Sequence, residues 1–327
     1  MERIAIIGLG LIGGSLGMAL KRAASSDVEI IGCDESRKAR SRAVKLQAVD
    51  RAQGDILKAV RGAQLVVVAT PILAMRQVME AMGPGLDRGC VVTDTGSTKT
   101  QIMAWAEEFL PATVDFVGGH PMAGKEMPGI DNADPELFQD ATYCIIPSPR
   151  ASARAIKSVI GLAEGVGATP FFPDPVEHDG LVAAISHLPL ISSTALLSAT
   201  TSSPSWQQMS RLAASGFRDA TRLASTDPEM SAGICLTNRE AIARCIDRYI
   251  EELEGYKRLL SEGEGELQAR FAQAREARET WLRGEETEPK GAGRRGSPAG
   301  SWLSPGRLMG RMGGVAFNPG RKREPQG

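Results

Sequence analysis

The sequence RIAIIGLGLIG, residues 3–13, decides the fold class of the first half of this chain. A short apolar segment runs directly into three glycines spaced Gly-x-Gly-x-x-Gly, and residues 11–24 follow with helical spacing. A second apolar segment, EIIGCD at residues 29–34, comes next. Strand, glycine turn, helix and strand in this order predict a βαβ unit.

Each glycine of this turn has its own geometric role. Gly8 makes the tight turn, Gly10 lets the backbone approach a pyrophosphate, and Gly13 allows the helix to pack closely. The helix that starts at Leu11 and Ile12 directs its first amides and the positive end of its dipole at the same phosphates. The turn therefore predicts a dinucleotide cofactor.

Asp34 indicates which dinucleotide is preferred. It ends the second strand about 20 residues after the glycines, where a carboxylate accepts hydrogen bonds from ribose hydroxyls and repels a 2′-phosphate. This favours NAD over NADP, although Arg37 nearby weakens the preference.

The alternation of strands and helices continues to about residue 173. Near-continuous Val, Ile and Leu strands are typical of a parallel sheet covered by helices on both faces. We expect strands at 63–71, 90–97, 114–122, 142–147 and 169–173, with helices between them that include 152–165. The first half is therefore predicted to be an α/β doubly wound parallel sheet of the Rossmann type.

The pattern changes after Pro175. Stretches rich in Ala, Leu, Glu and Arg, without β-rich runs, predict helices at 176–200, 205–224, 228–261 and 264–283. We therefore predict an NAD-binding domain at 1–173, an all-helical substrate and dimerisation domain at 174–283, and a disordered basic tail at 284–327.

The tail invites a nucleic-acid hypothesis. Eight Lys and Arg residues lie from Lys290 onward, against the single acidic residue Glu324. Such a cluster can neutralise phosphates, but it contains no recognised nucleic-acid motif. We expect a solvated tail and no nucleic-acid partner.

Composition and the N-terminal sequence indicate the compartment. The five cysteines are scattered, without the paired spacing of a metal site or a disulfide framework, which fits a reducing cytoplasm. The N-terminus lacks the regions of a secretory signal, and no uninterrupted apolar run approaches the roughly 20 residues of a membrane span. We expect a soluble cytoplasmic protein with no metal.

Three further segments follow predicted strands, where ligands bind in an open α/β sheet. They are Thr70-Pro71, DTGSTK at 94–99 and GHPMAGKE at 119–126. With GLGLIGGS at 8–15, ISHLP at 185–189 and GFRDATRLASTDPEM at 216–230, they occur in the order found in one enzyme family. Over about residues 1–280 the chain resembles the prephenate and arogenate dehydrogenases, also called cyclohexadienyl dehydrogenases, of tyrosine biosynthesis.

The resemblance implies an oxidative decarboxylation. Members oxidise the hydroxyl-bearing ring carbon by hydride transfer to NAD while the carboxylate on the opposite ring carbon leaves as CO2. By this match, His120 accepts the hydroxyl proton and Ser97 orients the same hydroxyl. A neutral imidazole suits that task because its ordinary pKa lies near the operating pH.

The same match assigns the substrate contacts. Arg222 is expected to grip a substrate carboxylate with its planar guanidinium, and Arg218 is expected to assist. Glu126 matches a family glutamate that helps to gate or support the site, and His187 is a candidate for a second polar contact with the substrate. The substrate is then prephenate or arogenate, and the family's helical domain implies a homodimer.

Two positions depart from the family pattern. Leu190 stands where many members have histidine, and Ser231 where many have tryptophan, so the choice between prephenate and arogenate stays open. His178 is expected to cap the first helix of the second domain together with Asp179.

Two other functions are compatible with the glycine turn. A dehydrogenase of the β-hydroxyacid or imine reductase type would share the glycine turn, but it would leave GGHPMAG at 118–124 unexplained. A non-catalytic NAD sensor would need none of Ser97, His120 and Arg222.

Overall fold

The computed structural model describes residues 2–23, 28–125 and 127–284. The chain divides into two units, residues 1–246 and residues 247–327. Glu126 and residues 285–327, which include almost all of the predicted tail, lie outside the described residues.

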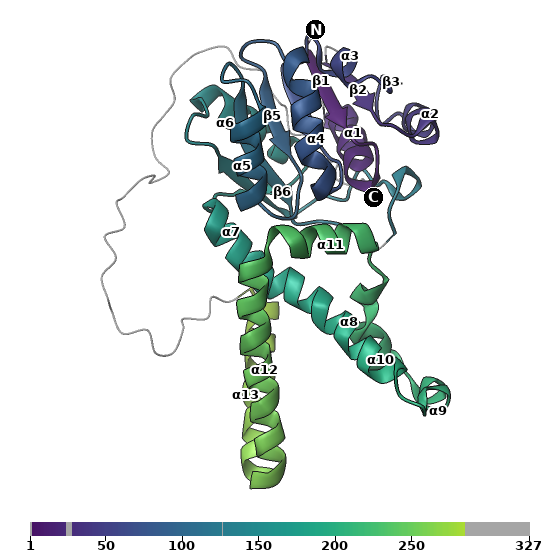
Figure 1. Ribbon diagram of the computed structural model, residues 1–327, viewed down its shortest axis with the longest axis vertical. Helices are drawn as coiled ribbons and strands as arrows, with labels where there is room; N and C mark the ends of the chain where they lie inside the picture. The colour runs from purple at the N-terminus through teal and green to yellow at the C-terminus, as the bar shows by residue number, and fades with distance from the viewer. Residues whose placement is uncertain (1, 24–27, 126, 285–327) are drawn as a thin grey trace, which may run out of the picture. The chain divides into compact units, whose positions relative to one another are not determined.

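The first unit is built on an eight-stranded sheet (Figure 1). Its strands are β1 (Glu2–Ile7), β2 (Val28–Cys33), β3 (Arg51–Gln53), β4 (Leu65–Val68), β5 (Val91–Asp94), β6 (Asp115–Pro121), β7 (Thr142–Pro147) and β8 (Thr169–Phe171). Their order in space is β3-β2-β1-β4-β5-β6-β7-β8. The chain runs outward from β1 to β3 and then returns to β4, so the switch point lies between β1 and β4, where such sheets bind ligands.

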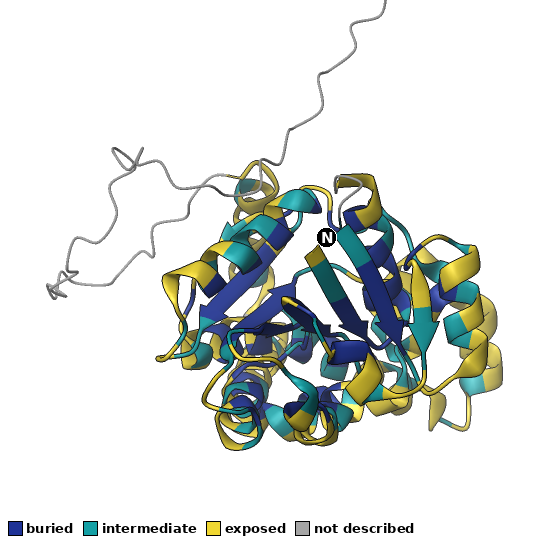
Figure 2. Cartoon of the chain, turned by 90° about the horizontal axis from the view of Figure 1, so that it is seen from above, coloured by how far each residue is buried: buried dark blue, intermediate teal, exposed yellow. Residues whose placement is uncertain are grey.

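Helices cover both faces of the sheet. They are α1 (Leu11–Ala23), α2 (Arg37–Lys45), α3 (Ile56–Val60), α4 (Ile72–Met82), α5 (Thr100–Phe109) and α6 (Ala153–Gly165). One apolar core joins the sheet to α3, α4 and α5, and a second joins its other face to α1, α2 and α6. Figure 2 shows the buried strands between helices whose outer sides are exposed. The predicted doubly wound α/β fold is confirmed.

One strand departs from the predicted parallel sheet. β7 pairs antiparallel to β6, with Gly119 opposite Ile145. The described residues of 122–141 contain the short 3₁₀ turn η2 (Ile130–Asn132) and no crossover helix, so the chain re-enters the sheet at the edge it has just left. α6 then supplies a crossover, and β8 runs parallel to β7.

The second part is helical, as predicted, but in shorter pieces. It consists of α7 (Pro175–Val182), the π-helical turn η3 (Ala183–His187), α8 (Leu188–Thr201), α9 (Trp206–Leu212), α10 (Ser215–Ala220), the 3₁₀ turn η4 (Arg222–Ser225), α11 (Pro228–Thr237), α12 (Arg239–Glu262) and α13 (Glu264–Leu282). The single helices expected at 205–224 and 228–261 are therefore wrong. Asn238 leaves helical geometry with φ −131°, which separates α11 from α12.

The helical run Pro175–Thr201 has an unusual composition. It is 27 residues long and contains an 18-residue window with a mean hydropathy of 1.6, which meets the length and composition criteria for a membrane span. It nevertheless contains the buried residues His178, Asp179 and His187, of which Asp179 accepts hydrogen bonds from the amides that begin α5. The first helix of the run is therefore tied to the sheet domain, whereas only 28% of the apolar window is buried.

The second unit contains most of α12 together with α13. Gly263, with φ +125°, makes the turn between the two helices, a conformation that favours glycine. The rings of Tyr256 and Phe271 lie 5.6 Å apart, and Arg270 pairs with Glu252. The two helices therefore contact each other directly.

Candidate active site

The glycine turn has the close packing that its sequence predicts. Gly8 has φ +95°, its amide donates to the Cys33 carbonyl at 2.8 Å, and a Cβ there would lie 2.5 Å from the Ala69 carbonyl oxygen. A Cβ on Gly13 would lie 1.9 Å from the Gly8 carbonyl oxygen. These two glycines bring β1, β4 and the start of α1 into backbone contact.

Gly10 differs from its two neighbours. A Cβ at this position would meet no described atom within 4 Å, so the space beside the turn is open. α1 begins at Leu11 and Ile12, and the carbonyl of Gly10 accepts the amide of Gly14 at 3.0 Å. An open glycine at a helix N-terminus is the cradle that a diphosphate requires.

The carboxyl end of β4 borders the same turn. Thr70 follows β4, and its Oγ1 is buried without a hydrogen-bond partner among the described residues. Pro71 is exposed and precedes the first residue of α4. An unpaired buried hydroxyl beside an open glycine turn fits a polar ligand such as the cofactor.

Asp34 is fixed at the end of β2 by the backbone. Its Oδ2 accepts the Leu9 amide and its Oδ1 accepts the Ser36 amide, each at 2.8 Å. Arg40 donates to the Asp34 carbonyl at 2.5 Å, which orders the loop further. The carboxylate therefore lies against the glycine turn, where a ribose would bind.

A buried ion pair joins β5 to β6. Lys99 Nζ pairs with Asp94 Oδ2 and donates to the Gly119 carbonyl at 2.6 Å, and both side chains are fully buried. Asp94 Oδ1 in turn accepts the Gly119 amide at 3.1 Å. Both backbone groups of Gly119, the residue before His120, are thus held in place. Burial lowers the pKa of Lys99, and the adjacent Asp94 carboxylate opposes that shift.

All three histidines of the chain lie in one cluster at this edge of the sheet. Nδ1 of His120 lies 2.9 Å from Nε2 of His178, and Nδ1 of His178 lies 2.9 Å from Oδ1 of Asp179. The rings of His120 and His178 meet edge to face, with centroids 5.1 Å apart. A continuous chain of hydrogen bonds therefore runs from His120 to Asp179.

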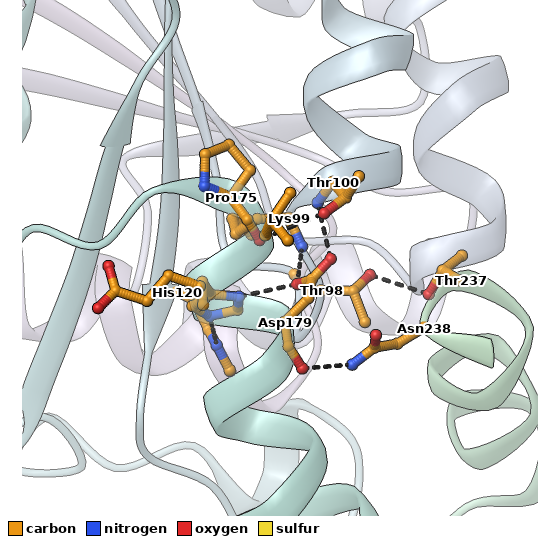
Figure 3. A network of polar contacts seen from close by, with 12 residues as sticks. Thr98, Lys99, Thr100, His120, Pro175, Asp179, Thr237 and Asn238 are labelled. Atoms are coloured by element: carbon orange, nitrogen blue, oxygen red, sulfur yellow. Dashed lines mark hydrogen bonds and ion pairs between the residues drawn. The ribbon is translucent and has the colours of Figure 1, made fainter. Parts of the chain in front are cut away.

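Asp179 also anchors the neighbouring elements (Figure 3). Its carboxylate accepts the amides of Lys99 at 2.6 Å and Thr100 at 2.9 Å, and so caps the N-terminus of α5. Its carbonyl accepts a hydrogen bond from Asn238 Nδ2 at 2.8 Å. Thr98 and Thr237 meet through their hydroxyls at 2.9 Å, which adds a second link between the loop after β5 and α11.

His187 joins the cluster through Asn238. The Asn238 amide nitrogen lies 3.2 Å from His187 Nδ1, which therefore accepts, and His187 Nε2 is buried without a partner among the described residues. Because a neutral imidazole carries one proton, that nitrogen presents an unpaired N–H. A buried donor of this kind suits a polar group of a ligand.

The electrostatics favour neutral imidazoles at His120 and His187. Burial lowers the pKa of His120 well below its usual value, and His178, Lys99 and His187 lower it further. Burial lowers the pKa of His187 to about 4, although Asp179 opposes the shift. Burial raises the pKa of Asp179, but hydrogen bonds from His178, Thr100 and the Lys99 amide together outweigh it and lower that pKa.

The other predicted site residues are more exposed. Ser97 is half-buried on the loop after β5, and its hydroxyl makes no hydrogen bond with a described residue. Arg218 on α10 and Arg222 on η4 are exposed, in a segment that packs on α8 and is tied to it by a hydrogen bond from Ser193 to the Ala220 carbonyl. Glu126 lies outside the described residues.

Sequence reasoning missed the role of His178. The expected helix cap by His178 and Asp179 is wrong, because Asp174 caps α7 in a capping box with Glu177. His178 instead lies one turn into the helix, 1% exposed and against His120. The sequence contained one signal for His178. The chain has three histidines, and the other two, His120 and His187, lie in motifs of the family.

Family models cover both the sheet domain and the helical part of the chain. Two family models match in succession, the prephenate dehydrogenase nucleotide-binding domain over residues 16–171 and the prephenate dehydrogenase dimerization domain over residues 174–274.

Individual relatives cover most of the chain. A prephenate dehydrogenase of Bacillus subtilis is 34% identical over 83% of this chain and 73% of its own length. A cyclohexadienyl dehydrogenase of Zymomonas mobilis is 34% identical over 85% of this chain and 95% of its own. The crystal structure of an Aquifex aeolicus prephenate dehydrogenase, in complex with hydroxyphenyl propionate and NAD+, superposes with a TM-score of 0.79 at 28% identity, covering 86% of this chain and 98% of that one. The chain belongs to the prephenate dehydrogenase family.

Proposed function

We propose that this protein catalyses the NAD-dependent oxidative decarboxylation of a cyclohexadienyl substrate, converting prephenate to 4-hydroxyphenylpyruvate or arogenate to tyrosine. NAD, when bound, accepts the hydride from the ring carbon that bears the hydroxyl. The open cradle at Gly10 and the carboxylate of Asp34 support the cofactor.

The arrangement of His120 is the observation that carries the proposal. It lies at the carboxyl end of β6, two strands along from β4 and its turn to Thr70. Its Nδ1 is engaged by His178, while its Nε2 makes no hydrogen bond with a described residue. A neutral, partly engaged imidazole at the ligand edge of an α/β sheet suits a base that removes a hydroxyl proton.

We assign the remaining contacts by their chemistry. Ser97 orients the substrate hydroxyl, and the unpaired N–H of His187 donates to a polar group of the substrate. Arg222, assisted by Arg218, binds a substrate carboxylate, because a guanidinium forms two parallel hydrogen bonds with such a group. Glu126 matches a family glutamate, and we assign it a supporting role.

The test is paired steady-state kinetics with prephenate and arogenate, followed as NADH absorbance. His120→Ala should lower kcat by about 10²- to 10⁴-fold, the usual contribution of a general base, while NAD binding persists. A wild-type protein that binds NAD but oxidises neither substrate would contradict the proposed function. A His120→Ala protein with wild-type kcat would contradict the role of His120 alone.

The larger organisation follows the same proposal. We assign cofactor binding to residues 1–173 and substrate binding with homodimer formation to residues 174–283. The dimerization-domain match over residues 174–274 supports a homodimer. We also place the enzyme in the cytoplasm, which its five free thiols, four of them buried, support.

A further inference from the structure

The hydrogen-bond chain from His120 to Asp179 is buried along its length. His120, His178 and Asp179 are 8%, 1% and 4% exposed. The catalytic function proposed above uses His120 and gives His178 and Asp179 no part in the chemistry, although a buried imidazole and a buried carboxylate are costly to maintain.

The partners of Asp179 determine where each proton lies. Its carboxylate accepts the amides of Lys99 and Thr100, so it is the acceptor for His178 as well, and His178 Nδ1 carries the proton. In a neutral His178, Nε2 is then an acceptor. The neighbouring Nδ1 of His120 must therefore carry a proton, which leaves His120 Nε2 with a free lone pair.

We infer that Asp179 and His178 are positioning residues that hold His120 in the tautomer with a basic Nε2, and that His178 takes up charge when the substrate proton arrives. This inference rests on the proposed function, in which His120 is the base. When Nε2 of His120 binds the hydroxyl proton, the proton on its Nδ1 passes to Nε2 of His178. The resulting imidazolium lies 2.9 Å from the Asp179 carboxylate.

The proton balance of the reaction suits a buried group that holds the hydroxyl proton temporarily. As hydride leaves the ring carbon, the electrons of the O–H bond form the carbonyl and the proton moves to His120. Loss of CO2 then sends the electrons of the broken C–C bond through the ring to that oxygen, which becomes a phenolate and takes the proton back. The same oxygen carries the hydrogen in the substrate and in the product, so the enzyme only has to hold the proton between the two steps. A relay closed to solvent prevents its loss to water.

The other charges around His120 leave Asp179 as the stabilising anion. Lys99, after β5, pairs with Asp94 and donates to the Gly119 carbonyl, and its positive charge lowers the pKa of His120. His187 from η3 has a pKa of about 4 and is neutral near neutral pH. Among the described residues, Asp179 supplies the carboxylate that lies within hydrogen-bond distance of His178.

Histidine NMR tests the tautomers directly. With [15N]histidine incorporated into the full chain, only three imidazoles give ring-nitrogen signals. Variants in which one histidine at a time is replaced assign these signals. In the NAD-bound enzyme we expect protonated Nδ1 and unprotonated Nε2 in both His120 and His178. Asp179→Asn should shift one or both toward the Nε2-protonated form. A wild-type His120 protonated at Nε2 would overturn the inference, as would an Asp179→Asn spectrum with both tautomers unchanged.

Kinetics separate positioning from proton uptake. His178→Gln keeps an amide oxygen that can accept the His120 Nδ1 proton but cannot bind it, whereas His178→Phe offers no acceptor. We expect kcat to decrease from wild type to His178→Gln to His178→Phe, with a total loss of about 10²-fold or more and an unchanged KM for NAD. Glu177→Gln, exposed on the same helix, is the matched control and should match wild type.

A pH profile excludes a purely structural effect. Removing the anion in Asp179→Asn should weaken the base and move the acid limb of kcat/KM to lower pH, whereas a packing defect would lower the plateau without moving the limb. Wild-type kcat in His178→Phe would overturn the inference. Failure of the wild-type enzyme on both substrates would contradict the proposed function instead, because the NMR result does not depend on turnover.

Discussion

At the scale of single residues, we predict that Asp34 determines the cofactor preference. Its two oxygens are oriented by the amides of Leu9 and Ser36, so Asp34→Asn retains one acceptor for the turn but removes the charge. Hydrogen bonds to charged groups contribute about 1.5–3 kcal/mol. We therefore expect kcat/KM for NAD to fall by about 10- to 100-fold and the discrimination against NADP to shrink. Initial rates with both cofactors measure this.

Glu35→Gln is the control for that substitution. Glu35 is the next residue, is exposed, and contributes its backbone carbonyl rather than its carboxylate to the contact with Arg40. It should leave both cofactor constants unchanged. Equal effects of the two substitutions would show that general charge near the site, and not the position of Asp34, sets the preference.

His187 makes stability depend on pH. Its folded-state pKa is about 4 against an ordinary 6.5, so between these values the unfolded chain binds the proton more readily. The stabilisation is complete above about pH 6.5 and is lost as the pH falls toward 4, by about 3 kcal/mol for a shift of this size. Urea unfolding across this range should show the decline, and His187→Gln should show a smaller one. An identical slope in the variant would contradict this prediction.

Single residues also show what sequence reasoning can find. Gly8, Gly13 and Asp34 were predictable because the glycine turn fixes their geometry locally. His178 was not, because its partner His120 lies 58 positions away and only the fold brings the two rings together. The roles of Ser97, Arg222 and Glu126 stay predictions.

At the scale of elements, the junction between the glycine turn and α1 separates cofactor binding from packing. Gly13→Ala places a Cβ 1.9 Å from the Gly8 carbonyl oxygen and should destabilise the protein despite the better helix propensity of alanine. Gly10→Ala meets no neighbour and should leave the free energy of unfolding nearly unchanged while it weakens NAD binding. Gly161→Ala on α6, also without a neighbour, is the control and should stabilise by up to about 1 kcal/mol. Equal NAD affinity in Gly10→Ala and wild type would contradict the cradle.

The link between β5 and β6 depends on a buried charge pair. Lys99→Met leaves Asp94 buried without its counter-ion, and breaking such a pair costs about 3–5 kcal/mol. Lys125→Met removes a partly exposed pair with Asp134 and should cost at most about 1 kcal/mol. Denaturant unfolding compares the two. Similar losses in both variants would mean that the buried pair is not strongly coupled.

Elements were predicted well where their pattern is local. The strands of the βαβ unit and β4 to β6 follow from their apolar runs, within a few residues at each end. The direction of β7 was not predictable, because it depends on residues 122–141 lacking a crossover helix. The π-helical turn before Pro189 is also a tertiary feature, in which the Leu188 amide bonds to the Ala183 carbonyl and His187 is placed in the cluster.

At the scale of the whole molecule, the second unit exposes several large apolar side chains. Beyond residue 246, α12 and α13 carry large apolar side chains that are at least 41% exposed: Tyr249, Ile250, Leu253, Leu260, Phe271, Trp281 and Leu282. Contiguous exposed apolar side chains mark protein interaction surfaces, and this unit overlaps the match to a dimerization domain. We therefore expect these helices to contribute to the homodimer.

Charge placed on that surface should dissociate the dimer. Leu253 and Leu260 are seven residues apart and share a face of α12, with exposed fractions of 51% and 74%. We expect the double variant Leu253→Arg, Leu260→Arg to sediment at the 34.8 kDa of one chain, whereas wild type sediments at twice that mass. Glu251→Arg changes the charge on another face of the helix and should remain dimeric. Because association stabilises the folded state by mass action, the wild-type Tm should rise with protein concentration while that of the double variant should not. A double variant that still sediments as a dimer would place the interface on other residues.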